Sequence, residues 1–165
     1  MRRTIIHTSV AIAFLLLVPS IGLACSCDLP PMNKTEKQLV ELERKKSKTL
    51  FVGEVVEIIV PKTASGAPAW VAEVRFKVQR KWKGAEAEEI SVFTANVCCV
   101  CGFKFEVGES YLVYAYGSDS LSTNTCTRTS RLSEAEKDLK VLGKTKASKN
   151  SKATQTLIQP KKYHD

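Results

Sequence analysis

Six cysteines in two groups far apart in the chain constrain how this sequence can fold. The first group is Cys25 and Cys27, and the second is Cys98, Cys99, Cys101 and Cys126. In an exported chain such cysteines indicate disulfide bonds, and fifteen pairings are possible. The one-residue spacing of Cys25 and Cys27 is too tight for an easy internal bridge. We therefore expect the first group to bond with the second, which would fix the N-terminal segment against the distal part of the domain.

The first 24 residues have the pattern of a secretory signal peptide. An arginine pair precedes an apolar stretch from Val10 to Val18, and small residues precede Cys25. The stretch is broken by Pro19 and is shorter than the ~20 residues that span a bilayer. We therefore expect cleavage between Ala24 and Cys25, a secreted protein that is extracellular or periplasmic, and no transmembrane segment after signal removal.

Lipid attachment to Cys25 is the alternative, because bacterial lipoprotein signals also end just before a cysteine. Such signals usually carry leucine at the position that Gly22 occupies, so plain secretion is the favoured interpretation. The distinction matters for function, since acylation would block the amine of Cys25.

The segment from Lys144 to Asp165 holds six lysines and one acidic residue, with almost no apolar periodicity. Such a segment cannot bury enough apolar surface to order itself, so we expect a basic, disordered tail after one domain spanning residues 25–143. A nucleic-acid-binding protein is expected to carry its basic residues on a folded face, with aromatic residues for stacking. We therefore expect no nucleic-acid partner, and the tail allows only a weak attraction to an anionic envelope.

Apolar alternation predicts about five strands. They are Leu50–Val60, Trp70–Trp82, Glu89–Thr94, Tyr111–Tyr116 and the threonine-rich Ser122–Thr129. The clearest alternation predicts a core face formed by Trp70, Ala72, Val74, Phe76, Val78 and Trp82. Gly53 lies inside the first strand and predicts a bend there.

Two capping-box patterns predict helices near the ends of the domain. One helix covers Asn33–Lys46, with Asn33 as its cap and Glu36 completing the box. The other is capped by Ser133 and ends at Gly143. Five strands with flanking helices predict a mainly β protein, either a small barrel or a sandwich. A five-stranded OB-fold (Greek-key) barrel fits the strand count.

The residue inventory argues against an enzyme. The only two histidines are His7, in the predicted signal, and His164, in the predicted tail. The domain therefore lacks the residue that most triads, activated thiols and zinc sites require. No phosphate-binding glycine loop occurs, and the acidic cluster of Glu86, Glu88 and Glu89 is typical of a solvated turn. We expect no catalytic activity and no cofactor.

A thiolate metal site is the alternative to disulfides. Thiolates suit copper(I) or zinc. The cysteines with suitable CxC and CCxC spacing are Cys25, Cys27, Cys98, Cys99 and Cys101. An oxidising compartment favours disulfides, so structural bridging is the favoured interpretation.

Several motifs occur in an order and spacing that together resemble a known family. They are CSCDLPP from Cys25, LFVGEVVEI from Leu50, VRFKVQRKWKG from Val74, VCG from Val100 and TC from Thr125. This set resembles the N-terminal inhibitory domain of the tissue inhibitors of metalloproteinases, part of the wider netrin-like module family. The chain looks like a bacterial relative over residues 25–143, and the resemblance implies an OB-fold barrel.

The resemblance also implies a disulfide pairing. The implied bridges are Cys25 with Cys101 and Cys27 with Cys126. The family's third bridge in this domain has no counterpart here. Cys98 and Cys99 are additional, and both a vicinal disulfide between them and an intermolecular bond remain open.

Inhibition of zinc metalloendopeptidases is the function that the resemblance implies. The residues that would contact the protease are Cys25, Ser26, Cys27, Asp28, Cys99 and Val100. The free amine and the carbonyl of Cys25 would chelate the catalytic zinc at its open position, and Ser26 would enter the adjacent specificity pocket. The two residues after Ser26 would continue along the cleft. A non-inhibitory netrin-like interaction module, exported with the same barrel, is the alternative.

Overall fold

The computed structural model describes residues 25–84, 86–97 and 100–144. The predicted signal peptide, Cys98, Cys99 and nearly all of the predicted tail lie outside these ranges. Within the described ranges, no helix combines the length and the apolar character needed to cross a membrane.

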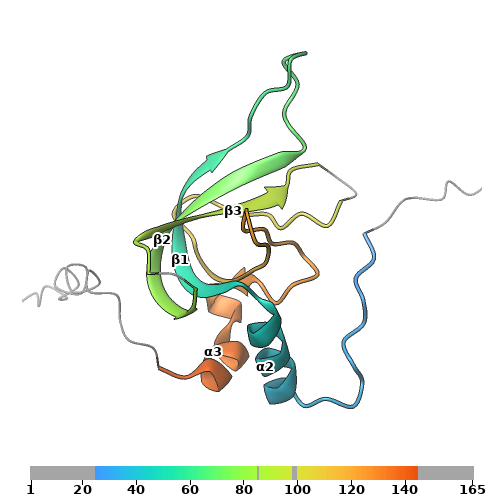
Figure 1. Cartoon of the computed structure of the whole chain (residues 1–165), viewed down its shortest axis with the longest axis vertical. Coiled ribbons are helices and arrows are strands. Elements are labelled where there is room, and N and C mark those ends of the chain that lie inside the picture. Colours follow the sequence, from blue (N-terminus) through green and yellow to red (C-terminus); the bar gives the residue numbers. More distant parts are fainter. Residues whose placement is uncertain (1–24, 85, 98–99, 145–165) are drawn as a thin grey trace, which may run out of the picture.

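An antiparallel sheet of five strands forms the body of the domain (Figure 1). The strands are β1 (Thr49–Ile59), β2 (Val71–Lys83), β3 (Glu89–Ala95), β4 (Ser110–Ala115) and β5 (Ser130–Arg131). Their order in the sheet is β3-β2-β1-β4-β5, so β1 lies at the centre and pairs with β2 and β4. The mainly β prediction is confirmed, and the first four strands lie within one residue of their predicted bounds.

Strand β1 contributes side chains to two apolar clusters, one on each face of the sheet. The inner core consists of Phe51, Val55, Val74, Phe76, Val78, Ile90, Val92, Phe105, Tyr111, Val113 and Ala115. The helix-side core consists of Val40, Leu50, Val52, Leu112, Tyr114, Ala135 and Leu142. Successive strand residues point to opposite faces, so one strand can supply both clusters. The bend predicted at Gly53 coincides with a register shift between Val52 and Gly53.

Two short helices cover the helix-side core, α2 (Glu36–Lys46) and α3 (Glu136–Leu142), and Figure 1 shows them next to each other below the sheet. The prediction that Asn33 caps the first helix is wrong. Thr35 is the cap: its hydroxyl accepts from Gln38 N–H at 3.3 Å, and its own N–H donates to Gln38 Oε1 at 2.9 Å. The physical reason is a turn over the preceding residues, in which Lys34 N–H donates to the Pro31 carbonyl.

The capping box predicted for the second helix is also wrong. A 3₁₀ turn, η1 (Leu132–Glu134), precedes α3, and Ala135 is the N-cap without a side-chain bond. Ala135 is buried in the helix-side core, and its N–H bonds to the Leu132 carbonyl at 3.3 Å. Packing of Leu132 and Ala135 therefore sets the start of the helix, and Ser133 stays exposed.

The threonine-rich segment Ser122–Thr129 is not the predicted fifth strand, because pairing with β4 is confined to Ser130 and Arg131. Threonine side chains in this segment bond to the backbone groups of β4. Thr129 Oγ1 accepts from Tyr114 N–H at 3.0 Å, and Thr123 Oγ1 donates to the Tyr114 carbonyl at 3.0 Å. Hydroxyls that can replace a backbone partner compete with strand pairing in this way.

Main-chain hydrogen bonds of residues 121–123 connect the edge strand β3 to the residue that follows β4. Phe93 N–H in β3 donates to the Leu121 carbonyl at 2.8 Å, and Thr123 N–H donates to the Phe93 carbonyl at 3.0 Å. Ser122 exchanges two further bonds with Tyr116, directly after β4, at 2.7 and 2.9 Å. This segment therefore lies between β3 and the end of β4.

The predicted core face of β2 is correct from Ala72 to Val78, but Trp70 is 73% exposed. Trp70 lies just before β2, and the β1–β2 hairpin projects away from the rest of the sheet (Figure 1). Its side chain is therefore mostly solvated at that end of the hairpin. Trp82, near the other end of β2, packs against the helix-side core.

Consecutive residues at the end of β2 bond to the C-termini of both helices. Trp82 Nε1 donates to the carbonyls of Leu142 and Gly143, both at 3.1 Å. Lys83 Nζ donates to the Arg44 carbonyl at 3.0 Å, to that of Lys45 at 2.8 Å and to that of Ser47. These side chains satisfy carbonyls that a helix end leaves without partners.

Replacement of Lys83 by methionine tests this role. Lys83→Met keeps an apolar stem of similar length but removes three charged hydrogen bonds to the end of α2, so we expect the free energy of unfolding to fall by about 1–2 kcal/mol. Urea unfolding measures the change. Lys77→Met, at an exposed position of the same strand, is the matched control and is expected to change stability by less than about 0.5 kcal/mol. Equal effects of the two substitutions would contradict the capping role.

Candidate functional site

The segment from Cys25 to Pro31 precedes α2, has no regular secondary structure and is exposed along its length. Figure 1 shows it running beside α2 on the outside of the domain. Leu29, in its middle, is 87% exposed. Apolar packing is therefore not what holds this segment in place.

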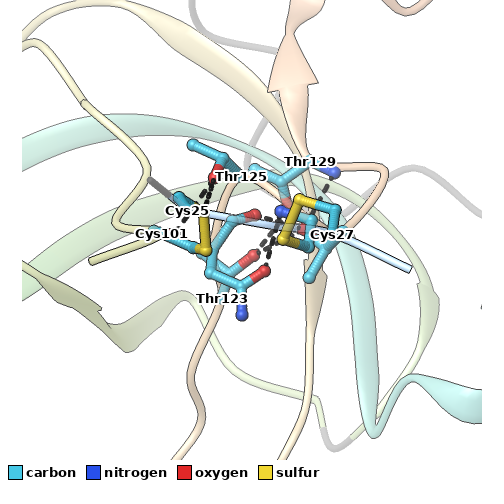
Figure 2. The surroundings of a disulfide bond; sticks show 9 residues. Cys25, Cys27, Cys101, Thr123, Thr125 and Thr129 are labelled. Carbon is cyan, nitrogen blue, oxygen red and sulfur yellow. Dashed lines mark hydrogen bonds between the residues drawn. A yellow bond between two sulfur atoms is a disulfide. The ribbon is translucent and has the colours of Figure 1, made fainter. Parts of the chain in front are cut away.

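Two disulfide bonds attach the segment to the domain (Figure 2). Cys25 bonds to Cys101 and Cys27 bonds to Cys126, with Cα atoms 5.3 and 5.2 Å apart. These are the pairs that the family resemblance implies. Ser26 and Asp28, the other two predicted protease contacts in this segment, are exposed on either side of Cys27.

The two bridges lie next to each other. All four sulfur atoms lie within 4.8 Å of one another. Thr125 lies beside them: its hydroxyl oxygen is 3.9 Å from Cys25 Sγ, and its N–H donates to the Cys101 carbonyl at 2.8 Å. The bridges and Thr125 thus form one compact junction between the N-terminal segment and two loops (Figure 2).

The first of these loops contains Val100 and Cys101. Val100 is 52% exposed and Cys101 is partly buried, whereas Cys98 and Cys99 lie outside the described residues. Gly102 approaches β3 so closely that a Cβ there would lie 2.0 Å from the Ala95 carbonyl oxygen. Phe103 N–H, the next donor, bonds to Thr94 Oγ1 at 2.8 Å. The loop is therefore fixed against the end of β3.

The second loop contains Cys126 and is fixed by an ion pair. Arg128 donates to both oxygens of Asp138 in α3, at 2.9 and 2.5 Å, and to Glu36 in α2. Asp138 is buried and also accepts from the Tyr114 hydroxyl at 2.7 Å. The bond to Asp138 raises the pKa of Arg128, whereas burial, reinforced by Asp138, raises the pKa of Tyr114. Arg128 thus stays a cation beside Asp138, and Tyr114 stays protonated as a hydrogen-bond donor to the same carboxylate.

A cavity of about 660 Å³ separates part of the N-terminal segment from the domain. Its lining comes from residues 28–31, from one face of α2 that includes Leu39 and Leu42, and from the loop with Cys126. Tyr116 and Glu43 also line it, and the Tyr116 hydroxyl donates to Glu43 at 2.6 Å. Burial and this bond raise the pKa of Tyr116.

The junction includes residues that sequence reasoning did not select. Thr125 and Gly102 belong to the TC and VCG motifs, but the sequence predicts no contact of either residue in the junction, and Arg128 lies in the segment predicted as a strand. A possible signal was the position of Thr125 and Arg128 beside Cys126 in a run of hydroxyl-bearing residues. Their partners lie far away in sequence, which local patterns do not reveal.

The arrangement provides a rigid, exposed backbone edge. Residues 25–144 contain no histidine, so the four bridged sulfur atoms are not part of a histidine-activated nucleophile. The polar groups that the edge exposes include its main-chain carbonyl and N–H groups. Comparison of the sequence with protein-family models gives no match, and comparison with curated proteins gives none either.

Removal of the bridges tests how much they stabilise the domain. Either bridge alone closes a long loop of the unfolded chain. Once one bridge is present, the other one closes only a short path through residues 25–27 and 101–126. Replacing one pair, for example Cys27→Ser with Cys126→Ser, is expected to lower the free energy of unfolding by about 3–4 kcal/mol, and replacing both pairs by about 8 kcal/mol.

Urea unfolding of three variants, one without each pair of cysteines and one without both pairs, gives these values. The comparison uses a common background with Cys98→Ser and Cys99→Ser, so that no further thiol can exchange. A loss below about 1 kcal/mol for one pair would show that its bridge does not constrain the unfolded chain as this model of loop entropy requires.

Proposed function

We propose that this domain is an OB-fold barrel of the kind found in the tissue inhibitors of metalloproteinases and other netrin-like modules. The strand order supports this proposal, because β1 pairs with both β2 and β4. So do the bonds of residues 121–123 to β3 and to the end of β4, since they join the two sides of the sheet. Closure of this kind removes open sheet edges.

We further propose that the protein inhibits zinc metalloendopeptidases after cleavage between Ala24 and Cys25 and export from the cell. One observation carries the proposal: Cys25 to Asp28 form an exposed edge that two adjacent disulfides fix to the domain. Val100, exposed in the loop bonded to Cys25, would extend the contact surface. An edge that is rigid before binding loses little conformational entropy on association.

The inhibitory contact would act through backbone atoms. The sulfur of Cys25 is occupied by Cys101, but its amine and carbonyl remain as a pair of zinc ligands. Such a pair can displace the water from the open position of a catalytic zinc. Ser26 has a small side chain that fits a pocket beside the metal, and Cys27 and Asp28 would continue along the cleft.

A non-inhibitory interaction module is the second candidate, and exposed apolar side chains of the β1–β2 hairpin favour it. Trp70 is 73% exposed, and Val56, Val60 and Val71 are also exposed. Tryptophan is enriched at protein interfaces, so an exposed tryptophan on a projecting hairpin is a candidate contact residue. This candidate requires the barrel and the hairpin but no free amine at Cys25.

Extension of the N-terminus by one residue separates the two candidates. The mature protein, with its first residue checked by intact mass, is titrated against a panel of zinc endopeptidases, beside a variant with one alanine before Cys25. We expect inhibition that weakens at least about 100-fold in the extended variant, because loss of roughly 3 kcal/mol of zinc coordination corresponds to that factor.

Two controls make the result specific. Trp70→Ala removes the largest exposed side chain of the hairpin and is expected to leave the inhibition constant unchanged if Cys25 supplies the zinc ligands. Thermal unfolding checks that both variants keep the fold. Equal inhibition by the extended and native proteins, or no inhibition of any enzyme by protein that begins at a free Cys25, would overturn the inhibitor proposal.

A further inference from the structure

The disulfide junction brings together four sulfur atoms that two covalent bonds alone would not require to be neighbours. Each bridge fixes the distance within its own pair, yet the sulfur atoms of Cys25, Cys27, Cys101 and Cys126 all lie within 4.8 Å of one another (Figure 2). The single residue between Cys25 and Cys27 and the positions of the two loops produce this proximity.

The separations match a tetrahedral metal site. Zinc–thiolate bonds of about 2.3 Å at tetrahedral angles place sulfur atoms about 3.8 Å apart. Sulfur atoms already within 4.8 Å reach that spacing with shifts of about 1 Å once the bridging bonds are broken. Four thiolates form a closed set, which is typical of structural rather than catalytic zinc.

We propose that the reduced protein binds one Zn²⁺ ion through Cys25, Cys27, Cys101 and Cys126. This site differs from the cysteine set that the sequence suggested, because it includes Cys126 and needs neither Cys98 nor Cys99. It also does not rest on the inhibitory function, since it forms in the state without bridges.

The redox change balances with a dithiol as the reductant. Two dithiol molecules are oxidised to disulfides and supply four electrons and four protons, which convert the two bridges into four thiols. Binding of Zn²⁺ then releases four protons and leaves a site with two net negative charges. Thr125, whose hydroxyl lies 3.9 Å from Cys25 Sγ, is placed to donate a hydrogen bond to a thiolate.

The consequence is that the N-terminal segment stays attached in both redox states. In the oxidised protein two disulfides hold it to the loops of Cys101 and Cys126. In the reduced protein one metal ion would hold the same four residues. Oxidation would expel the ion, because a sulfur atom in a disulfide is no longer a thiolate ligand.

Cobalt is a suitable probe, because Co²⁺ in a tetrahedral thiolate site has strong sulfur-to-metal charge-transfer and d–d absorption. The full chain with Cys98→Ser and Cys99→Ser is reduced with a dithiol, freed of reductant without air, and titrated with Co²⁺ and then Zn²⁺. We expect one Co²⁺ per chain, a four-sulfur spectrum and its loss on addition of Zn²⁺. The oxidised protein is the control and is expected to bind none.

Removal of one ligand tests the site itself. Loss of a second-shell partner typically weakens a metal site 10–100-fold, so Cys126→Ser in the same background is expected to weaken Co²⁺ binding by more than about 100-fold. Circular dichroism follows folding, and metal-induced recovery of the native spectrum would support the proposal. Absence of one-to-one binding, binding unaffected by Cys126→Ser, or a chain that stays unfolded with metal bound would overturn it.

Discussion

Strand β1 has a partner strand on each side, and the packing of the whole domain is organised around it. Its backbone groups bond to β2 on one side and to β4 on the other. Its side chains are buried on both faces, with Phe51 in the inner core and Leu50 in the helix-side core. Because β1 takes part in both clusters, the helices and the strands cannot pack independently of each other.

The candidate site depends on this framework at three points. The end of β3 holds the loop of Cys101 through Gly102, and β4 holds the threonine-rich segment through Tyr114. Arg128 then connects the loop of Cys126 to both helices. The exposed segment contributes little packing of its own. Two disulfide bonds attach it to the loops, and these buried contacts therefore fix its position.

Sequence reasoning succeeded where the physical signal is local. Strand β2 could be predicted because its alternation reflects burial of one face, from Ala72 to Val78. It failed where two local patterns compete or where a distant partner decides. Thr35 and Asn33 both fit a helix cap, and only a preceding turn selects Thr35. Threonine is common in strands, but the hydroxyl of Thr129, rather than its backbone, bonds to β4.

The same limit applies to the site. The export pattern and the spacing of the cysteines indicated that Cys25 and Cys27 bond to the distal group, and the resemblance supplied the pairs. Neither could show that the four sulfur atoms are neighbours or that Arg128 bonds to two helices.

The two bridges cross, because Cys27 lies inside the loop closed by Cys25 and Cys101 whereas Cys126 lies outside it. Any single backbone cut between residues 25 and 126 therefore leaves the two pieces covalently joined. A protease that cleaves the exposed turn at residues 62–68 would thus produce a nicked molecule rather than two separate fragments.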